Sequence, residues 1–480
     1  MIAVQLNKRD FEYDIHSLIR AFYPGVDVTV FQEDEAAVTD YEYKLEVKYL
    51  ADRIDLTWKD ASDTVLSACG REVEYEKDRK ETKNVLKSIL YEMLRDYTGQ
   101  DLPWGNLTGI RPTKIAMGLL EKGWTNPQIA EYMRNTYYTS NEKTALAISI
   151  ANRERHILKD INYQNGYSLY VGIPFCPSIC LYCSFSSSPL SVWRDKVDDY
   201  LDALCKEIEA CSKIYADREL NTVYIGGGTP TTLEPYQLDR LLTKLEECFD
   251  YSKLLEFTVE AGRPDSITKE KLQVLRDHNI SRISINPQTM NDQTLELIGR
   301  RHTVAETVEA FQLARSMGFD NINMDLIVGL PGEEYEQAEH TMKEVIALDP
   351  DSITVHSLAV KRAARLNMFK DQYKEMTFTN NCQIMDMTAR MAAEAGHAPY
   401  YLYRQKNMAG NFENVGYAKP DAAGIYNILI MEEKQSILAL GAGATTKVVV
   451  GDHIERTENV KDIRNYIQRI DEMIERKRIC

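Results

Sequence analysis

Three cysteines lie close together in the segment Tyr170 to Phe185, which reads YVGIPFCPSICLYCSF. Cys176, Cys180 and Cys183 form a C-x-x-x-C-x-x-C pattern that directly follows a short apolar run. Three thiolates at this spacing, without a fourth at a regular interval, suit a metal centre that keeps one coordination position open. The pattern therefore favours an iron-sulfur cluster in which one iron has no protein ligand.

Two other interpretations of the three cysteines were weighed against the cluster. A structural zinc site normally combines two C-x-x-C pairs, or one pair with an H-x-x-x-H, and the sequence holds no second pair of either kind. Three unrelated buried cysteines are the other alternative, because a lone cysteine packs as a small apolar side chain. Pro177 and Ser178 indicate a tight loop, which argues against simple core packing.

A glycine-rich turn is the second feature with the potential to bind a ligand. Gly226, Gly227 and Gly228 follow a strand-like segment and precede Thr229 and Pro230. Without side chains, the backbone can approach a ligand closely and offer its N–H groups to polar atoms. Turns use glycine often, so the triplet alone is weak evidence. Its position one strand-helix unit after the cysteines strengthens the prediction.

The elements that must position these residues alternate regularly between strand and helix after residue 167. Periodicity predicts strands at Leu169 to Ile173, Thr222 to Ile225, Glu256 to Glu260, Arg282 to Asn286, Asn321 to Val328 and Ser352 to Leu358. Helical stretches separate them, which predicts a parallel sheet with helical crossovers, either open or closed as a barrel. Most of the unusual residues follow the carboxyl ends of these strands, where α/β barrels carry their chemistry.

The chain divides by pattern into three parts. Residues 1–160 predict a separate N-terminal α/β domain, with strands near Ile2 to Leu6 and Tyr43 to Leu50 and a helix at Lys77 to Tyr97. Residues 167–370 form the alternating barrel region. Residues 371–480 predict a small C-terminal α+β lobe that covers the barrel mouth.

Composition limits the classes of partner and the compartment. The 480-residue chain is 44% hydrophobic and carries a formal net charge of −16, which argues against general binding to nucleic acid or an anionic membrane. No run approaches the roughly 20 apolar residues of a membrane span, and the first residues do not resemble a signal peptide. We therefore expect a cytoplasmic protein whose other cysteines remain thiols.

These motifs together resemble a known family. The pattern Y-x-x-x-P-F-C-x-x-x-C-x-Y-C-x-F, then G-G-G-T-P, then a glutamate ending the next strand is similar to the radical S-adenosylmethionine (SAM) superfamily. The segment Asp325 to Pro331 resembles the D-L-I-x-G-L-P motif of the oxygen-independent coproporphyrinogen III oxidase group. The leader resembles that group's longer-chain branch, coproporphyrinogen dehydrogenase HemZ. The resemblance implies a partial (β/α)6, TIM-like radical SAM barrel.

The resemblance also implies roles for individual residues. Cys176, Cys180 and Cys183 would bind three irons of a [4Fe-4S] cluster, and SAM would chelate the fourth. The positions that match the family's contacts to SAM are Tyr170, Gly227, Gly228, Thr229, Glu260, Gln288, Arg300 and Asp325. Singly, several of these have structural interpretations, such as a helix cap for Glu260 or Asp325 and a solvated charge for Arg300. Their serial order along successive strands favours the functional interpretation.

The reaction implied by the resemblance is the oxidative decarboxylation of two propionates of coproporphyrinogen III, which gives protoporphyrinogen IX. Its partners would be this tetrapyrrole and an electron donor such as flavodoxin or ferredoxin. Four carboxylates on the substrate call for local positive charge, and Arg pairs with carboxylates through two parallel hydrogen bonds. The candidates are Lys361, Arg362 and Arg365, just beyond the last barrel strand, and then Arg404 with Lys406.

Two departures from the oxidase pattern keep other functions open. Gly172 stands where the group usually has a histidine, and Phe185 stands where the oxidases have a further cysteine. The ending Y-C-S-F is closer to the haem-chaperone branch. The alternatives are therefore a haem-binding chaperone and a radical SAM enzyme that acts on haem. Axial ligation of haem would call on a histidine, with His302, His356 and His397 as candidates.

Overall fold

The computed structural model describes residues 1–480 except 37, 76–77, 110, 186, 360–363, 369–377, 405–411, 452 and 479–480. It describes the backbone of Asn367 but not its side chain. The chain forms two compact units. One comprises Met1–Asn152 with Gly410–Phe412, and the other comprises Arg153–Ala409 with Glu413–Cys480. Each unit has its own sheet and its own apolar core, and each is described by itself.

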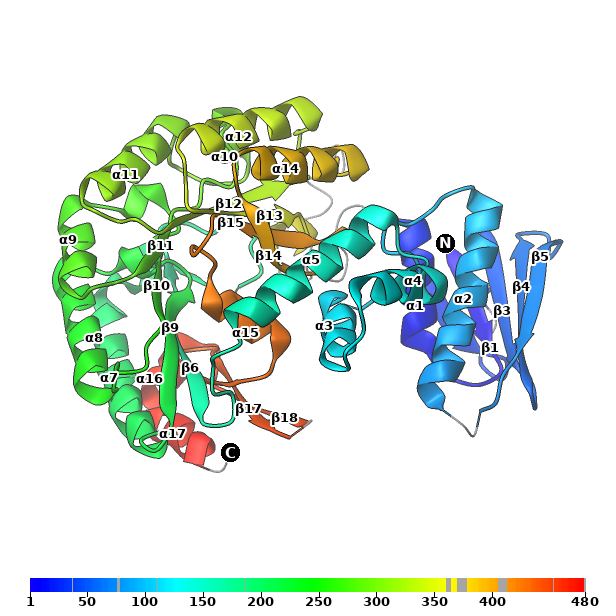
Figure 1. The fold of residues 1–480 in the computed structure, drawn as a ribbon, viewed down its shortest axis with the longest axis horizontal. Helices are drawn as coiled ribbons and strands as arrows, with labels where there is room; N and C mark the ends of the chain where they lie inside the picture. The colour runs from blue at the N-terminus through cyan, green and yellow to red at the C-terminus, as the bar shows by residue number, and fades with distance from the viewer. Residues whose placement is uncertain are drawn as a thin grey trace. The chain divides into compact units, whose positions relative to one another are not determined.

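The N-terminal unit is built on a five-stranded mixed sheet in the order β2-β1-β3-β4-β5. Its strands are β1 Ile2–Leu6, β2 Val28–Gln32, β3 Tyr43–Tyr49, β4 Arg53–Asp60 and β5 Val65–Glu72. Helices α1 Glu12–Phe22 and α2 Arg79–Thr98 cover one face of this sheet (Figure 1), and α3 Thr113–Glu121, α4 Asn126–Tyr137 and α5 Asn141–Ile157 follow. The sequence did not predict β5, because this edge strand is largely exposed and lacks an alternating apolar pattern.

The second unit is organised around an eleven-stranded sheet in the order β14-β15-β13-β12-β11-β10-β9-β6-β16-β17-β18. The strands from β13 to β16 in this order run parallel to their neighbours. They are β6 Gly166–Ile173, β9 Glu219–Gly227, β10 Glu256–Glu260, β11 Arg282–Ser284, β12 Ile322–Val328, β13 Ser352–Ser357 and β16 Ser436–Leu440. Six of these are the strands that the sequence predicted.

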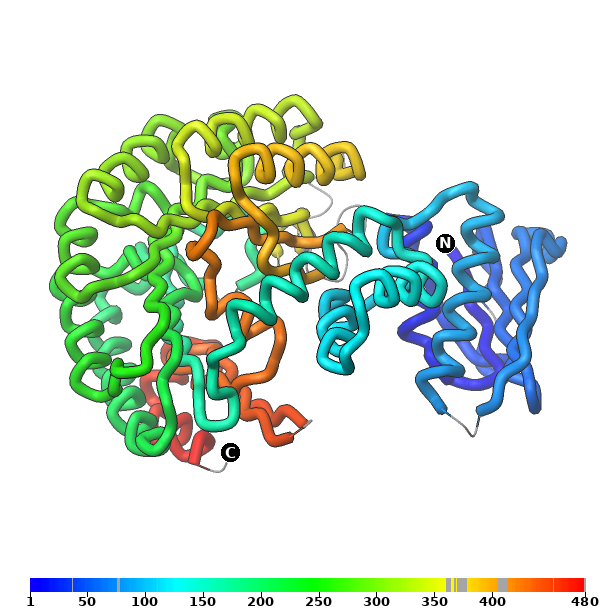
Figure 2. The backbone as a smooth tube through the Cα atoms, in the orientation of Figure 1, coloured from blue at the N-terminus to red at the C-terminus, as the bar shows by residue number. Residues whose placement is uncertain are grey.

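Helices connect these parallel strands on the outside of the sheet. They are α7 Val197–Ile214, α8 Pro235–Cys248, α9 Lys269–Asp277, α11 Val304–Ser316 and α12 Tyr335–Ala347. Figures 1 and 2 show them as an arc around the curved strands. Their starts are fixed locally, for example by the capping box between Thr303 and Glu306 at α11. Helices over a curved, largely parallel sheet form a partial TIM-like barrel, which confirms the predicted fold class.

The C-terminal segment extends the same sheet at both edges. The sequence placed residues 371–480 in a lobe of their own, whereas β15 Asn414–Ala418 pairs antiparallel with β13 and β14 Ala398–Tyr403 pairs with β15. At the other edge β16 pairs with β6, and the hairpin of β17 Thr445–Val450 and β18 His453–Glu458 follows. Four helices, α14 Cys382–Glu394, α15 Ile425–Glu432, α16 Ile463–Gln468 and α17 Ile470–Arg478, complete this part.

A buried charge network attaches the last helix to the sheet behind β6. The Lys477 ammonium group donates to Glu207 at 2.5 Å, and both side chains are almost fully buried. The same carboxylate accepts hydrogen bonds from Tyr466, Asn459 and the backbone N–H of Gly441. A buried ion pair is tolerated when further hydrogen bonds satisfy both partners, as they do here.

We expect that Lys477→Ala destabilises the protein by about 3 kcal/mol or more, because Glu207 would keep a buried charge without its cation. Urea unfolding of the apoprotein, followed by circular dichroism, measures this loss. Lys206→Ala is the matched control, because Lys206 and Asp471 form an exposed pair between the same two helices at 2.6 Å. Its loss should cost less than about 1 kcal/mol. Equal losses in the two variants would contradict the structural role given to Glu207 and Lys477.

Candidate active site

A cavity of about 540 Å³ opens at the carboxyl ends of the parallel strands. Eleven residues that the sequence analysis singled out line it: Tyr170, Cys176, Cys180, Cys183, Gly227, Gly228, Thr229, Glu260, Gln288, Arg300 and Asp325. They come from segments up to about 155 residues apart, and the parallel register brings them to one edge of the sheet. This is the edge at which α/β barrels bind their ligands.

The cysteine loop is attached to the barrel on two sides. The Ser178 hydroxyl donates to the carbonyl of Gly299 at 3.0 Å, and the N–H of Leu181 donates to the carbonyl of Ile298 at 2.9 Å. Arg263 adds a hydrogen bond to the Ser178 hydroxyl at 3.0 Å. A loop with these contacts presents its three thiols to the cavity in a defined arrangement.

The glycine-rich turn packs directly against the first cysteine. The N–H of Gly228 donates to the carbonyl of Ile173, and the N–H of Thr229 donates to the carbonyl of Phe175, both at 2.7 Å. The Thr229 hydroxyl lies 3.6 Å from the sulfur of Cys176. A Cβ atom on Gly228 would lie 2.5 Å from the Phe175 oxygen and 3.0 Å from that sulfur. Only glycine fits at this position without moving the loop.

The three thiols fit an iron-sulfur cluster better than a single ion. Within the part of the chain that the structure describes, no three Cys, His, Asp or Glu side chains lie close enough together to bind one metal ion. The cysteines nonetheless share one cavity wall, and a cluster spreads its ligands over several irons. Burial raises the pKa of the Cys176 thiol to about 11 and also raises that of Cys183. Cationic irons would offset this cost of ionising the thiols.

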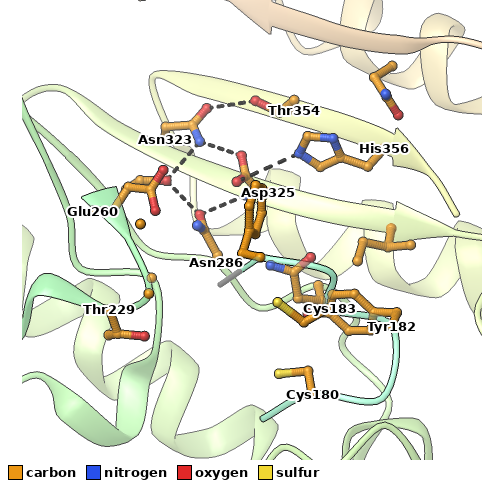
Figure 3. Close-up of a pocket in the computed structure, with 18 of the residues that line it drawn as sticks. Cys180, Tyr182, Cys183, Thr229, Glu260, Asn286, Asn323, Asp325, Thr354 and His356 are labelled. Atoms are coloured by element: carbon orange, nitrogen blue, oxygen red, sulfur yellow. Dashed lines mark hydrogen bonds and ion pairs between the residues drawn. The ribbon is translucent and has the colours of Figure 1, made fainter. Parts of the chain in front are cut away.

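Glu260 ends β10 and faces the cavity opposite the cysteine loop (Figure 3). The Tyr224 hydroxyl donates a hydrogen bond to its carboxylate. Burial raises the pKa of Glu260 to about 7, outweighing the opposite effects of Tyr224, His356 and Arg282. A cationic ligand group placed beside this carboxylate would reverse the shift. Glu260 is therefore suited to receive an amino group.

Asp325 lies in the middle of β12, in a polar network with residues of β12 and β13. Asn323 donates to its carboxylate at 2.7 Å, and His356 lies 3.7 Å away across the strand (Figure 3). Burial favours the neutral acid, yet the pKa of Asp325 is lowered, because the nearby His356 and hydrogen bonds from Asn323 and Thr354 stabilise the carboxylate. Asp325 thus tends to be ionised, whereas Glu260 in the same cavity tends to hold its proton.

Gln288 and Arg300 also lie at the cavity wall, each held by the backbone. Gln288 has a left-handed backbone conformation (φ 69°) and is paired with β12 through its N–H and carbonyl. The Arg300 guanidinium donates to the carbonyl of Asn286 at 2.5 Å. Its neighbours Tyr182 and Cys180 outweigh burial and raise the pKa of Arg300. Arg300 is thus a buried wall residue, which rules out the solvated surface charge considered as its alternative.

The basic residues expected to bind substrate are placed differently. Arg365 lies in α13 Arg365–Met368 with its side chain exposed, and it does not line the cavity. Lys361, Arg362 and Lys406 lie outside the described residues. Arg404 is buried away from the cavity, and burial lowers its pKa to about 10. The sequence correctly placed Arg365 beyond β13, but it did not predict that this residue lies outside the cavity wall.

The three histidines considered as haem ligands also differ in placement. His302 is buried, and burial and the charge of Arg300 lower its pKa to about 3. His397 is buried and bonded to the carbonyl of Pro350 at 2.9 Å. Neither lines the cavity, whereas His356 does. Of the three, only His356 can therefore contact a ligand in this cavity.

Sequence reasoning missed several residues of the cavity wall. They include Tyr224, Arg263, Arg282, Asn286, Asn323, Thr354, Tyr401, Tyr403 and Tyr426. Tyr224 stacks on Tyr426 with ring centroids 4.5 Å apart, and Tyr401 stacks on Tyr403 at 6.2 Å. The positions of Asn286 and Asn323, two residues before the predicted site residues Gln288 and Asp325, were a usable signal. Tyr401, Tyr403 and Tyr426 gave none, because β14, β15 and α15 were not predicted.

Comparison with known proteins places this cavity in a family. Residues 170–345 match the Radical SAM superfamily. The oxygen-independent coproporphyrinogen-III oxidase-like protein HemZ of Bacillus subtilis is 40% identical over 404 residues, which cover 83% of this chain and 81% of HemZ. The chain belongs to the radical SAM superfamily. Within it, the chain belongs to the group of oxygen-independent coproporphyrinogen III oxidases and their relatives.

Two further relatives lie in the same group. The heme chaperone HemW of Bacillus subtilis is 32% identical over 310 residues, covering 64% of this chain and 76% of HemW. The solved structure of coproporphyrinogen III oxidase (HemN) from Escherichia coli, a radical SAM enzyme, matches with a TM-score of 0.53 and 26% identity. This structural match covers 65% of this chain and 70% of the HemN chain. The cofactors of this radical SAM protein are accordingly a [4Fe-4S] cluster and SAM, as the resemblance implied.

We expect that Gly228→Ala impairs cluster assembly, because the added Cβ would push against the Phe175 carbonyl and the Cys176 sulfur. Iron and sulfide content after anaerobic reconstitution should fall severalfold, with loss of the visible absorption of the cluster. Gly262→Ala is the control, because Gly262 lines the same cavity and its nearest neighbour would be Asn286 at 3.4 Å. A Gly228→Ala protein with a full cluster would show that the turn does not position Cys176.

The raised pKa of Glu260 predicts a pH dependence of stability. Between its ordinary value of 4.5 and about 7, the folded apoprotein holds a proton that the unfolded chain has released. The unfolding free energy therefore falls as pH rises through this window, by up to about 3 kcal/mol and by less where water enters the cavity. Glu260→Gln should lose this slope. Urea unfolding of the wild type and of Glu260→Gln at several pH values measures the two unfolding free energies. A difference between them that stays constant with pH would contradict the raised pKa of Glu260.

Proposed function

We propose that this radical SAM protein oxidatively decarboxylates two propionates of coproporphyrinogen III to give protoporphyrinogen IX. The observation that carries the proposal is a cavity that combines the three cysteines with the strand-end residues Glu260 and Asp325, in a chain 40% identical to HemZ. HemN, whose name states the same reaction, shares the fold. At each propionate, one hydrogen atom would pass to the 5′-deoxyadenosyl radical, one electron would pass to a separate one-electron acceptor, and CO₂ would leave, so that a vinyl group remains.

The chain's own residues would bind, orient and shield the reactants. Cys176, Cys180 and Cys183 would hold the cluster, which with SAM supplies a hydrogen-abstracting 5′-deoxyadenosyl radical. Glu260 would receive the amino group of SAM, because its carboxyl lies buried at the end of β10. The ionised Asp325 would accept hydrogen bonds from hydroxyl groups of the ligand. Tyr170 and the glycine-rich turn would close the cavity against water.

The tyrosine side chains that line the cavity suit a flat macrocycle. Tyrosine rings of Tyr224, Tyr426, Tyr401 and Tyr403 line the cavity and stack in pairs. Aromatic rings offer large apolar surfaces, and their hydroxyl groups keep polar contacts with carboxylates or water. Such a wall is consistent with a tetrapyrrole that presents pyrrole rings and propionates to the same cavity.

A haem-binding chaperone is the second candidate. HemW is 32% identical to this chain, and Phe185 occupies the position at which the sequence analysis noted a cysteine in the oxidases. The Phe185 side chain is 71% exposed and lines the cavity. An exposed aromatic ring at the entrance suits a chaperone that binds haem near its surface as well as an enzyme with a buried substrate.

We expect that the reconstituted protein, supplied anaerobically with SAM, a reductant such as reduced flavodoxin and coproporphyrinogen III, forms 5′-deoxyadenosine, CO₂ and protoporphyrinogen IX. Two molecules of CO₂ should appear for each protoporphyrinogen. Liquid chromatography of the porphyrins after oxidation and capture of labelled CO₂ measure the balance. Cys183→Ala should abolish all three products, because it removes one ligand of the cluster.

The same preparation separates the two candidates. Cys382→Ala is the matched control, because Cys382 is an exposed cysteine that begins α14 and does not line the cavity. It should retain turnover. Tight uptake of haem without any conversion of coproporphyrinogen by the wild-type protein would replace the oxidase proposal with the chaperone.

A further inference from the structure

His356 is a basic side chain of the cavity that the proposed cofactor sites leave without a role. It lies near the carboxyl end of β13, and its side chain is 25% exposed at the cavity wall. Its Nε2 faces a carboxylate oxygen of Asp325 at 3.7 Å, and its Nδ1 faces the hydroxyl of Tyr403 at 3.4 Å. Both contacts are longer than a normal hydrogen bond, so the ring is positioned between two groups without being tightly bound by either.

The other cations of the cavity are already engaged. Among the described residues that line it, the remaining basic side chains are Arg263, Arg282 and Arg300, which are 3%, 2% and 7% exposed. Arg263 pairs with Asp265 at 2.7 Å, and Arg300 donates to a backbone carbonyl. Arg282 donates to the hydroxyl of Ser352 at 2.8 Å below the cavity floor.

His356 is therefore the basic group among these residues with surface to offer a ligand. An anionic substrate in a protein of net charge −16 requires such a group nearby. The Arg365 side chain, which was expected to supply it, is exposed and does not line the cavity. The neighbouring Tyr403 adds an O–H donor on the same side, and its ring lies 6.4 Å from the imidazole.

We infer that His356 and Tyr403 together bind one propionate carboxylate of the tetrapyrrole. The imidazole Nδ1 and the phenol would donate to the two oxygens of the carboxylate, and Asp325 would keep the imidazole oriented through Nε2 (Figure 3). This inference rests on the proposed function, because it takes a propionate-bearing tetrapyrrole as the ligand. It identifies His356 as a residue that recognises the carboxylates of the substrate.

The position of His356 also explains how binding and reaction would be coordinated. Asp325 lies between the histidine and the strand-end groups assigned to SAM (Figure 3). A carboxylate held at His356 would place the adjoining carbons of that propionate toward the centre of the cavity. Holding a reacting carbon in a fixed place beside the group that attacks it supplies a large part of an enzyme's rate enhancement.

The test measures binding rather than turnover. The reconstituted full-length protein is titrated anaerobically with coproporphyrin III and with its tetra-amide, in which each carboxylate is an uncharged carboxamide. Porphyrin fluorescence reports the two dissociation constants. The wild-type protein should prefer the tetra-acid. His356→Asn should raise the dissociation constant of the tetra-acid roughly tenfold, about what a hydrogen bond to a charged group contributes. The dissociation constant of the tetra-amide should change by less than about twofold.

Companion variants distinguish a direct contact from a general disturbance of the wall. Tyr403→Phe keeps the ring and should weaken the tetra-acid severalfold. His356→Lys restores a positive charge and should recover part of the preference. Asn427→Ala is the control, because Asn427 lines the cavity from α15 and has no contact with His356 in the described structure. It should leave the ratio of the two dissociation constants unchanged.

The affinity for SAM, measured on the same proteins by equilibrium dialysis, provides the opposing outcome. Loss of SAM binding in His356→Asn with the tetra-acid preference intact would overturn the inference and make His356 a support for Asp325. An equal loss of affinity for the tetra-acid and the tetra-amide in His356→Asn would also overturn the inference. If the wild type never converts coproporphyrinogen but its acid preference depends on His356, the proposed reaction fails and the inference stands. If the wild type converts coproporphyrinogen but its preference for the tetra-acid does not depend on His356, the proposed reaction stands and the inference fails.

Discussion

The pairing of β6 with β9 is the constraint on which the site depends. Its register sets Ile173 beside Gly227, so the strand that leads into the cysteine loop and the strand that leads into the glycine-rich turn end at the same level. Two backbone hydrogen bonds at 2.7 Å then join the loop to the turn. Glycine at position 228 allows this approach, because a side chain there would meet both the Phe175 carbonyl and the Cys176 sulfur. Cluster ligands and SAM-binding turn are thereby one structural unit.

Burial gives the same cavity two carboxylates of opposite character. Glu260 is flanked by a phenol and gains little to offset its burial, so its pKa rises. Asp325 is equally surrounded but accepts from Asn323 and faces His356, so its pKa falls. The difference comes from the donors that each strand end supplies, and it assigns a cationic ligand group to one carboxylate and neutral donors to the other.

The sequence predicted the fold and the strand-end groups because both follow from local pattern. Parallel strands such as β12 are buried on both faces and appear as apolar runs, and helices such as α9 and α11 begin at clear capping residues. The family resemblance singled out Glu260, which ends β10, and Asp325, which lies in the middle of β12. The tyrosine wall was not predictable in this way. Tyr401, Tyr403 and Tyr426 come from β14 and α15, and β14 joins the sheet through the antiparallel pairing of β15 with β13, a long-range contact without a local signal. The absence of Arg365 from the cavity wall could not be predicted from spacing either.

The place of β16 in the sheet has a consequence for the order of synthesis. β6 carries the chain into the cysteine loop, but its neighbour on one side is β16, made more than 260 residues later, and the buried Glu207 receives its cation only from Lys477. While the chain emerges from the ribosome, β6 therefore has one unpaired edge, and the contacts behind Gly172 are missing. Iron delivery to the three thiols should thus wait until β16 and Lys477 have been made, because the sheet that fixes the positions of the thiols is incomplete before then.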